Sequence, residues 1–187
     1  MEQTSVKDLM VPISAYATVR VGTTLLNAMI ALENAQEAYT TSKYQHRAIL
    51  VLDNDNTVVG KIGQLRVLKA VENREDLDTE VENLNRFGFS NQYIAGRREH
   101  SRLKGSILSE DSLLVAAEKK VEEFMQQPTP GECVSEDCSM DIAIHRLVAG
   151  THLSLLVTRK NKIVGILRIA DVFAAVSNKM RGTGSSE

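Results

Sequence analysis

A chain of 187 residues is long enough for one ordinary domain or for two small halves that share a core. The formal net charge is −2, so the composition shows no electrostatic footprint for nucleic acid, and no apolar run approaches the roughly 18 residues of a membrane span. The amino terminus lacks the basic start and apolar run of a secretory signal, and two cysteines are too few for a disulfide framework. We therefore predict a soluble, cytoplasmic globular protein that binds neither nucleic acid nor membranes.

The first half of the chain predicts one strand, a helix, a two-stranded hairpin and a second helix. Thr23 or Thr24 can cap the first helix, whose apolar residues recur at helical spacing. The turn-rich run Asp53–Asn56 separates two β-type runs, which is a hairpin signature. The expected elements are a lead-in at 6–12, a strand at 19–21, a helix from 25, strands at 48–52 and 57–62, and a helix at 64–73.

The second half repeats this order. A shift of 105 positions places Gly60 on Gly165, and a shift of 115 places Thr24 on Ser139. The two shifts differ by ten, so the first copy has ten extra residues within the stretch Glu33 to His46. A unit too small to bury its own apolar face suggests that the two copies complete one core together.

Between the copies lies a polar segment, from about Arg74 to Thr129, that the repeat does not explain. Its clearest feature is one amphipathic helix predicted over Glu110–Gln127, with Ser109 as a cap and Pro128 as its end. We expect the last residues, 181–187, to form a flexible tail.

The doubled unit resembles the cystathionine-β-synthase (CBS) domain pair. The residues that carry the resemblance are the lead-in Val6–Pro12, the runs Arg47–Asp53 and Val59–Gly60, and their counterparts Leu155–Val157 and Val164–Val172. The resemblance implies an α/β fold in which two β-α-β-β-α repeats pack with pseudo-two-fold symmetry around a helical insert. The expected units are repeat 1 at 1–73, the insert at 74–128, repeat 2 at 129–180 and the tail at 181–187.

Proteins of this family are regulatory modules, often dimeric, that bind adenosine-containing ligands in the clefts between paired repeats. The resemblance implies AMP, ADP, ATP or S-adenosylmethionine as the ligand, a homodimer, and a regulated protein that the sequence does not identify. The family signature has a Ser or Thr three residues after the hairpin Gly and an Asp six residues after it. That Asp accepts hydrogen bonds from the ribose hydroxyls, which suits a carboxylate because it only accepts.

Of the four signature positions in the two repeats, this chain matches one. Asp171 stands at the ribose position of the second repeat, but Arg168 replaces the hydroxyl residue; in the first repeat Gly63 and Arg66 stand at the two positions. Arginine has no acceptor, so at most one nucleoside site is expected, centred on Asp171. By the resemblance, the site comprises Asp171, Arg168, Ile169, Ala170, His152, His46, Arg47, Ala48, Ala15 and Ala17.

Each of these residues also has an ordinary explanation. An acid such as Asp171 is favoured in the first turn of a helix without any ligand. Arg168 can be solvated or ion-paired, and His46 and His152 can be plain loop residues. The missing hydroxyl residues favour an alternative, a non-enzymatic dimerisation or interaction module with degenerate sites, for which the 110–127 helix would offer a surface.

The sequence recommends neither catalysis nor a metal. The run beginning at Asp53 fails the calcium-loop pattern, because its sixth position is Val58 rather than Gly and its twelfth is Gln64 rather than Glu. No nucleophile with a base and no phosphate-binding loop stands out as a local motif. We predict no catalytic residues, no metal, no required cofactor, and a protein that is not an enzyme.

Overall fold

The computed structural model describes residues 5–39, 45–72, 83–84, 86–102 and 108–183. Both halves have the predicted order of strand, helix, strand, strand, helix. In the first half these are β2 (Thr18–Arg20), α1 (Leu25–Ala38), β3 (Ala48–Leu52), β4 (Val58–Gly63) and α2 (Gln64–Glu72). In the second half they are β5 (Cys133–Ser135), α7 (Met140–Ala149), β6 (Ser154–Arg159), β7 (Lys162–Arg168) and α8 (Ile169–Thr183). The prediction of a mixed α/β fold is confirmed.

Each repeat builds its own sheet in the same order. In the first, β3 lies between β2, which is parallel to it, and β4, which is antiparallel. In the second, β6 lies between β5 and β7 with the same directions. The central strands are continuous apolar runs because both of their faces are covered, and Ile49, Leu50, Leu155 and Leu156 are fully buried.

Local polar residues set the element ends as expected. The hydroxyl of Thr24 accepts from the backbone N–H of Asn27 at the start of α1. In the first hairpin, the Asp53 carboxylate accepts from the backbone N–H of Thr57, and Asn56 has a φ of 59°. The Asp53–Asn56 run therefore serves as a turn.

The sequence did not reveal that the two lead-ins are exchanged between the repeats. The amino-terminal lead-in forms η1 (Val6–Asp8), β1 (Val11–Pro12) and η2 (Ile13–Ala15), and β1 joins the sheet of the second repeat beside β7. Val6 is fully buried in the core of that repeat. The matching residue, 115 positions later, is Val121, and it is fully buried in the core of the first repeat.

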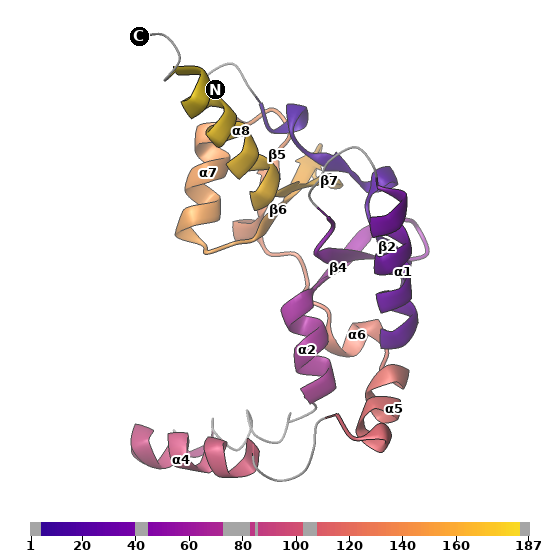
Figure 1. Ribbon diagram of the computed structural model, residues 1–187, viewed down its shortest axis with the longest axis vertical. Helices are drawn as coiled ribbons and strands as arrows, with labels where there is room; N and C mark the ends of the chain where they lie inside the picture. Colours follow the sequence, from indigo (N-terminus) through magenta and orange to yellow (C-terminus); the bar gives the residue numbers. More distant parts are fainter. Residues whose placement is uncertain (1–4, 40–44, 73–82, 85, 103–107, 184–187) are drawn as a thin grey trace.

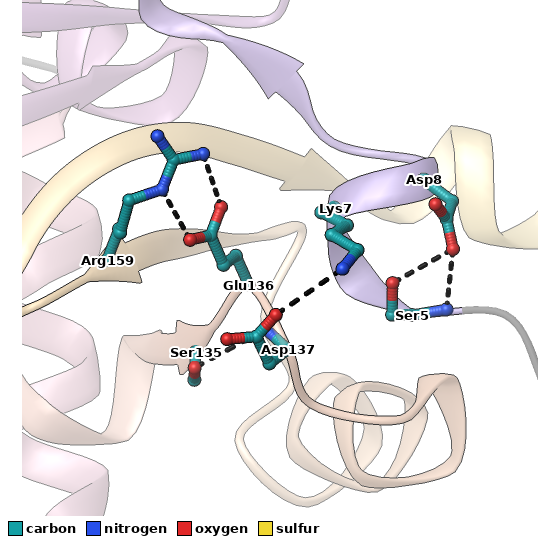
Figure 2. A network of polar contacts seen from close by, with 7 residues as sticks. All are labelled: Ser5, Lys7, Asp8, Ser135, Glu136, Asp137 and Arg159. Carbon is teal, nitrogen blue, oxygen red and sulfur yellow. Dashed lines mark hydrogen bonds and ion pairs between the residues drawn. The ribbon is translucent and has the colours of Figure 1, made fainter.

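Polar contacts fasten the amino-terminal lead-in to the second repeat (Figure 2). The backbone N–H of Lys7 donates to the Glu136 carbonyl at 3.0 Å, and its ammonium lies 3.5 Å from the Asp137 carboxylate. Glu136 is itself buried and accepts from Nε and Nη2 of Arg159, the last residue of β6. The loop after β5 is thus held from both sides.

The helix predicted over 110–127 is two helices, α5 (Glu110–Glu118) and α6 (Val121–Phe124). They are separated because Lys119 and Lys120 have extended backbones, with ψ angles of 138° and 146°. The insert also contains α4 (Asn91–Arg102), which was not predicted; Figure 1 shows it at the end of the molecule away from α7 and α8. After the insert, a short 3₁₀ helix, η3 (Pro130–Glu132), leads into β5.

Part of the apolar surface of α5 and α6 is covered by the first repeat. Ala116, Val121 and Phe124 are buried in the first repeat's core, against α1, α2 and β4. Those three residues are therefore unavailable to a partner, whereas Leu113 and Leu114 of α5 are 40% and 64% exposed, so a partner surface on this helix stays a prediction. Parts of the predicted insert lie outside the described residues.

Three apolar clusters form the interior. One lies within each repeat, and the third joins the two, with Tyr16, Ala48 and Leu50 from the first half and Leu156 and Ile166 from the second. The expected packing of the two copies against each other is therefore present. Helix α8 continues to Thr183, so the start of the expected tail is helical, and residues 184–187 lie outside the described part. Within the described residues, none of the helices has the length and apolar character needed to cross a membrane.

Candidate functional site

Arg168 and Asp171 form a nearly buried ion pair where β7 passes into α8. Arg168 Nε lies 2.5 Å from Asp171 Oδ2, and Nη2 lies 2.7 Å from Oδ1. The two side chains are only 6% and 13% exposed. Burial works against the charge of Arg168, but the bonds to Asp171 prevail and raise the pKa of the guanidinium above its ordinary value. The two charges meet because a spacing of three residues brings them together at the helix start.

His46 brings the first repeat to this ion pair. It lies just before β3, is fully buried, and places Nδ1 3.5 Å from Arg168 Nη1. A guanidinium can only donate, so this contact assigns the lone pair to Nδ1 and the proton to Nε2. His46 Nε2 is buried and has no hydrogen-bond partner within the described structure. Burial, followed by the nearby charge of Arg168, lowers the pKa of His46, so the ring is neutral at pH 7.

Two tyrosines enclose His46, and the sequence reading did not name either of them. The Tyr16 ring meets the His46 ring edge-on with centroids 4.3 Å apart, and the Tyr39 ring lies 4.4 Å away on a tilted plane. Arg168 Cζ lies 5.2 Å from the centroid of Tyr39. Burial raises the pKa of Tyr16 to about 12, although the charge of Arg168 opposes this rise. Tyr16 could have been found, since it lies between the two alanines that the resemblance selected.

The other residues predicted for the site take different places. Ala17 and Ala48 are buried core residues, whereas Ala15 and Arg47 are exposed. The backbones of Arg47 and Ala48 lie against the Tyr16 hydroxyl, and the backbone of Ala15 lies against His46. Ile169 is 42% exposed and Ala170 is half-buried in the first turn of α8. The structure therefore brings Arg168, Asp171 and His46 into direct contact and places the backbones of residues 15, 47 and 48 beside them.

His152 lies in a second polar cluster, which we call the Glu132 cluster: Lys61, Gln126, Glu132 and His152. Glu132 Oε1 accepts from Gln126 Nε2 at 2.6 Å and lies 3.5 Å from Lys61 Nζ and 3.9 Å from His152 Nδ1. Glu132 is 4% exposed, and its Oε2 has no hydrogen-bond partner within the described structure. The sequence reading did not name Glu132, which takes the place of Ala17 in the other copy.

The Arg168–Asp171 pair leaves unused acceptor positions on the carboxylate. A carboxylate offers about four lone-pair positions, and the guanidinium fork uses two of them. The remaining two suit the adjacent hydroxyls of a ribose. At the equivalent positions of the first repeat, Arg66 is exposed and Gly63 is half-buried, so that side offers no carboxylate. Among the described residues, no three His, Cys, Asp or Glu side chains gather as metal ligands.

Comparison with known proteins identifies the fold. The family model of the CBS domain matches residues 121–178, beginning at the first residue of α6. A CBS-domain protein of unknown function from Bacillus anthracis is similar over 95% of this chain and 96% of its own, with a TM-score of 0.63 and 21% identity. The chain also matches CBSX2 in complex with AMP over 94% of this chain and 98% of that one, with a TM-score of 0.57 and 19% identity.

A third solved structure, protein MJ1004 from Methanocaldococcus jannaschii, is similar over 94% of this chain, with a TM-score of 0.57 and 17% identity. This chain spans only 60% of that protein's length. A comparison with curated proteins finds no match. At such identities the structural likeness shows the fold alone. The chain has the fold of a CBS domain pair, and its residues 121–178 carry a CBS domain.

Proposed function

We propose that this protein is a regulatory module that binds an adenosine-containing nucleotide at Asp171, between the two repeats. The observation that carries the proposal is the contact of the Arg168–Asp171 pair with His46, because it joins groups from both copies at one point. The AMP in the CBSX2 structure supports the ligand class. AMP, ADP, ATP and S-adenosylmethionine are all candidates, and the module itself performs no chemistry.

In this proposal, each group of the site contacts a different part of the nucleotide. Asp171 accepts from the ribose hydroxyls, and its two bonds to Arg168 fix the orientation of the carboxylate. The backbone N–H of Ile169 already donates to the Leu153 carbonyl at 3.0 Å. A phosphate at the start of α8 would therefore meet the N–H groups of Ala170 and Asp171, where the helix dipole favours an anion.

Binding becomes a signal if the ligand holds the two repeats in one arrangement. Asp171 belongs to the second repeat and His46 to the first, so a nucleotide touching both favours the arrangement in which they are close. The shift is limited by the difference in the ligand's affinity for the two arrangements. A regulated partner protein would respond to that arrangement.

Calorimetry with ribose and deoxyribose ligands tests the role of Asp171. Wild-type protein should bind AMP at least about tenfold more tightly than 2′-deoxy-AMP, because charge-assisted bonds contribute roughly 1.5–3 kcal/mol each. Asp171→Asn should remove most of that preference, while the exposed Arg66→Ala at the equivalent helix position should keep it. Absence of heat with all four candidates, or an unchanged preference in Asp171→Asn, would remove the proposal.

A second candidate function, a homodimerisation module, is favoured by exposed apolar side chains at equivalent positions. Leu68 on α2 and Phe173 on α8 correspond under the 105 shift and are 65% and 68% exposed. Two matching apolar faces on one chain suit a second copy of the same chain. Sedimentation should show a dimer that Leu68→Asp with Phe173→Asp converts to a monomer. An unchanged dimer would place the interface elsewhere, and a monomeric wild type would exclude this candidate.

A cytoplasmic location stays a prediction. It is in keeping with the two free thiols, those of Cys133 and Cys138, within the described residues. Fractionation of cells that express the tagged chain would test it.

A further inference from the structure

Tyr39 reaches the site from an element that the second repeat does not have. Helix α1 has 14 residues, whereas its counterpart α7 has 10. Under the 115 shift Asn34 matches Ala149, the last residue of α7, so α1 continues for about one further turn. That extra turn contains Gln36, and Tyr39 follows directly after it.

The extra turn is fastened to the site by two contacts. Gln36 Nε2 donates to the backbone carbonyl of His46 at 2.5 Å. The ring of half-buried Tyr39 packs against the His46 ring, with centroids 4.4 Å apart, and lies 5.2 Å from Arg168 Cζ. Tyr39 therefore covers surfaces of both side chains that join the two repeats.

Those surfaces are suited to a purine base. A guanidinium stacks on aromatic faces, and aromatic rings pair in offset or tilted arrangements such as the one seen here. His46 adds a buried Nε2–H donor with no partner in the described structure, which an acceptor nitrogen of a base or a phosphate oxygen could take up. One ring can occupy this position at a time.

We propose that Tyr39 is a built-in occupant of the nucleotide site, resting on His46 and Arg168 until a purine base displaces it. This inference rests on the proposed nucleotide-binding function and adds a residue that sets its affinity. The protein's own ring competes with the ligand, so nucleotide affinity depends on how firmly the extra turn of α1 holds Tyr39. A partner that moves the last turn of α1, and Tyr39 with it, away from the site would raise the affinity for the nucleotide. By reciprocity, nucleotide binding would favour the displaced position of that helical turn.

Calorimetry with AMP on three proteins tests the competition. Tyr39→Ala removes the competing ring and should bind AMP about 2- to 30-fold more tightly than wild type, the range expected for a cation–π contact. Tyr39→Phe keeps the ring and should bind as wild type does. Binding by Tyr39→Ala where the wild type is silent would also support the proposal. Equal or weaker binding by Tyr39→Ala, with a wild type that binds, would overturn it and leave the proposed function standing.

A measurement without nucleotide distinguishes failure of this inference from failure of the proposed function. Among the described residues, the charged and titratable groups that face His46 are Tyr16, Tyr39, Arg168 and Asp171. Removal of the Tyr39 ring admits water, so the NMR-titrated pKa of His46 should rise toward 6.5 in Tyr39→Ala and stay low in Tyr39→Phe; His46→Gln assigns the signal. An unchanged pKa in Tyr39→Ala would overturn the contact itself. If the pKa rises but neither protein binds a nucleotide, the proposed function fails and this inference fails with it.

Discussion

Two glycines at equivalent positions of the repeats should differ in how well they tolerate a larger side chain, because different atoms of the exchanged lead-ins cover them. Gly60 and Gly165 each lie beneath the lead-in of the other copy. A Cβ on Gly165 would lie 2.7 Å from the carbonyl oxygen of Val11 and 3.0 Å from Met10 Sδ. A Cβ on Gly60 would meet Sδ, Cγ and Cβ of Met125, and the two closest of these atoms, Sδ and Cγ, belong to the flexible part of the side chain. Backbone held in the β1–β7 pairing cannot move aside, but a methionine can change rotamer.

Gly165→Ala should therefore lower the free energy of unfolding by about 1–3 kcal/mol, the usual cost of overpacking, and Gly60→Ala by less than about 1 kcal/mol. For a chain of this size each kcal/mol lowers the melting temperature by about 2–4 °C. Urea unfolding followed by circular dichroism measures both changes.

A double-mutant cycle identifies the atoms responsible. Met125→Ala should relieve most of the cost of Gly60→Ala, because it removes the two closest atoms, Sδ and Cγ, and leaves only Cβ at 3.1 Å. Met10→Ala should leave most of the cost of Gly165→Ala, because the Val11 carbonyl stays in place. Equal costs for the two alanines, or full rescue of Gly165→Ala by Met10→Ala, would refute the exchanged arrangement.

Three further changes test the polar contacts. Glu132→Ala leaves the Lys61 ammonium, 12% exposed, without its carboxylate and should cost about 3–5 kcal/mol in urea unfolding; a loss below 1 kcal/mol would contradict the ion pair. The bonds from Arg159 hold the pKa of Glu136 below its ordinary 4.5, so their stabilisation is present above pH 4.5 and is lost as pH falls through the folded-state pKa. Glu136→Gln should flatten acid unfolding curves in that range, and parallel curves would count against the pair. Because the pKa of Tyr16 is raised to about 12, stability should fall between pH 10 and 12 as the unfolded chain ionises first, and Tyr16→Phe should abolish this part of the alkaline transition seen by tyrosinate absorbance.

The sequence predicted the elements whose signals are local. The caps at Thr24 and Ser109 and the turn at Asp53 each depend on residues within a few positions, so the chain displays them directly. The Arg168–Asp171 contact is local too, at a spacing of three, and ion pairing was one of the readings left open for Arg168. The duplicated pattern in the sequence also predicted the order of strands and helices in both halves.

Features that depend on distant partners were missed. The apolar residues of α5 and α6 share one helical period, and the sequence shows no break at Lys119 because the extended backbone there is imposed by docking on the first repeat. The backbone N–H of Leu25 donates to the Lys119 carbonyl, and that of Val121 donates to the Thr23 carbonyl. Likewise Tyr39 lies in the ten extra residues, where alignment of the copies offers no counterpart and hence no expected role.

Each lead-in crosses to the other repeat and pairs with a strand there, and we call these two contacts the crossings. They differ in chemistry, which predicts a difference in their local stability. The amino-terminal crossing pairs two buried apolar residues, Val11 and Ile166, whereas the equivalent crossing pairs Gln126 with Lys61 beside buried Glu132. Apolar burial needs no partner geometry. A buried carboxylate whose second oxygen receives no hydrogen bond from any described residue, as in Glu132, carries a desolvation cost that opening to water relieves.

Hydrogen exchange should therefore release the backbone N–H groups of Lys61 and Gln126, each bonded to the other's carbonyl at 2.9 Å, before that of Ile166. Glu132→Gln keeps the shape of the side chain and removes its charge. It should reduce the difference in exchange rate between Ile166 and the pair Lys61 and Gln126. Slower exchange at Lys61 than at Ile166 would mean that the polar cluster stabilises its crossing more than apolar packing stabilises the other. The insert would then be the more firmly attached of the two lead-in segments. The expected order makes the Lys61–Gln126 contact, which lies next to the insert, the one that opens first.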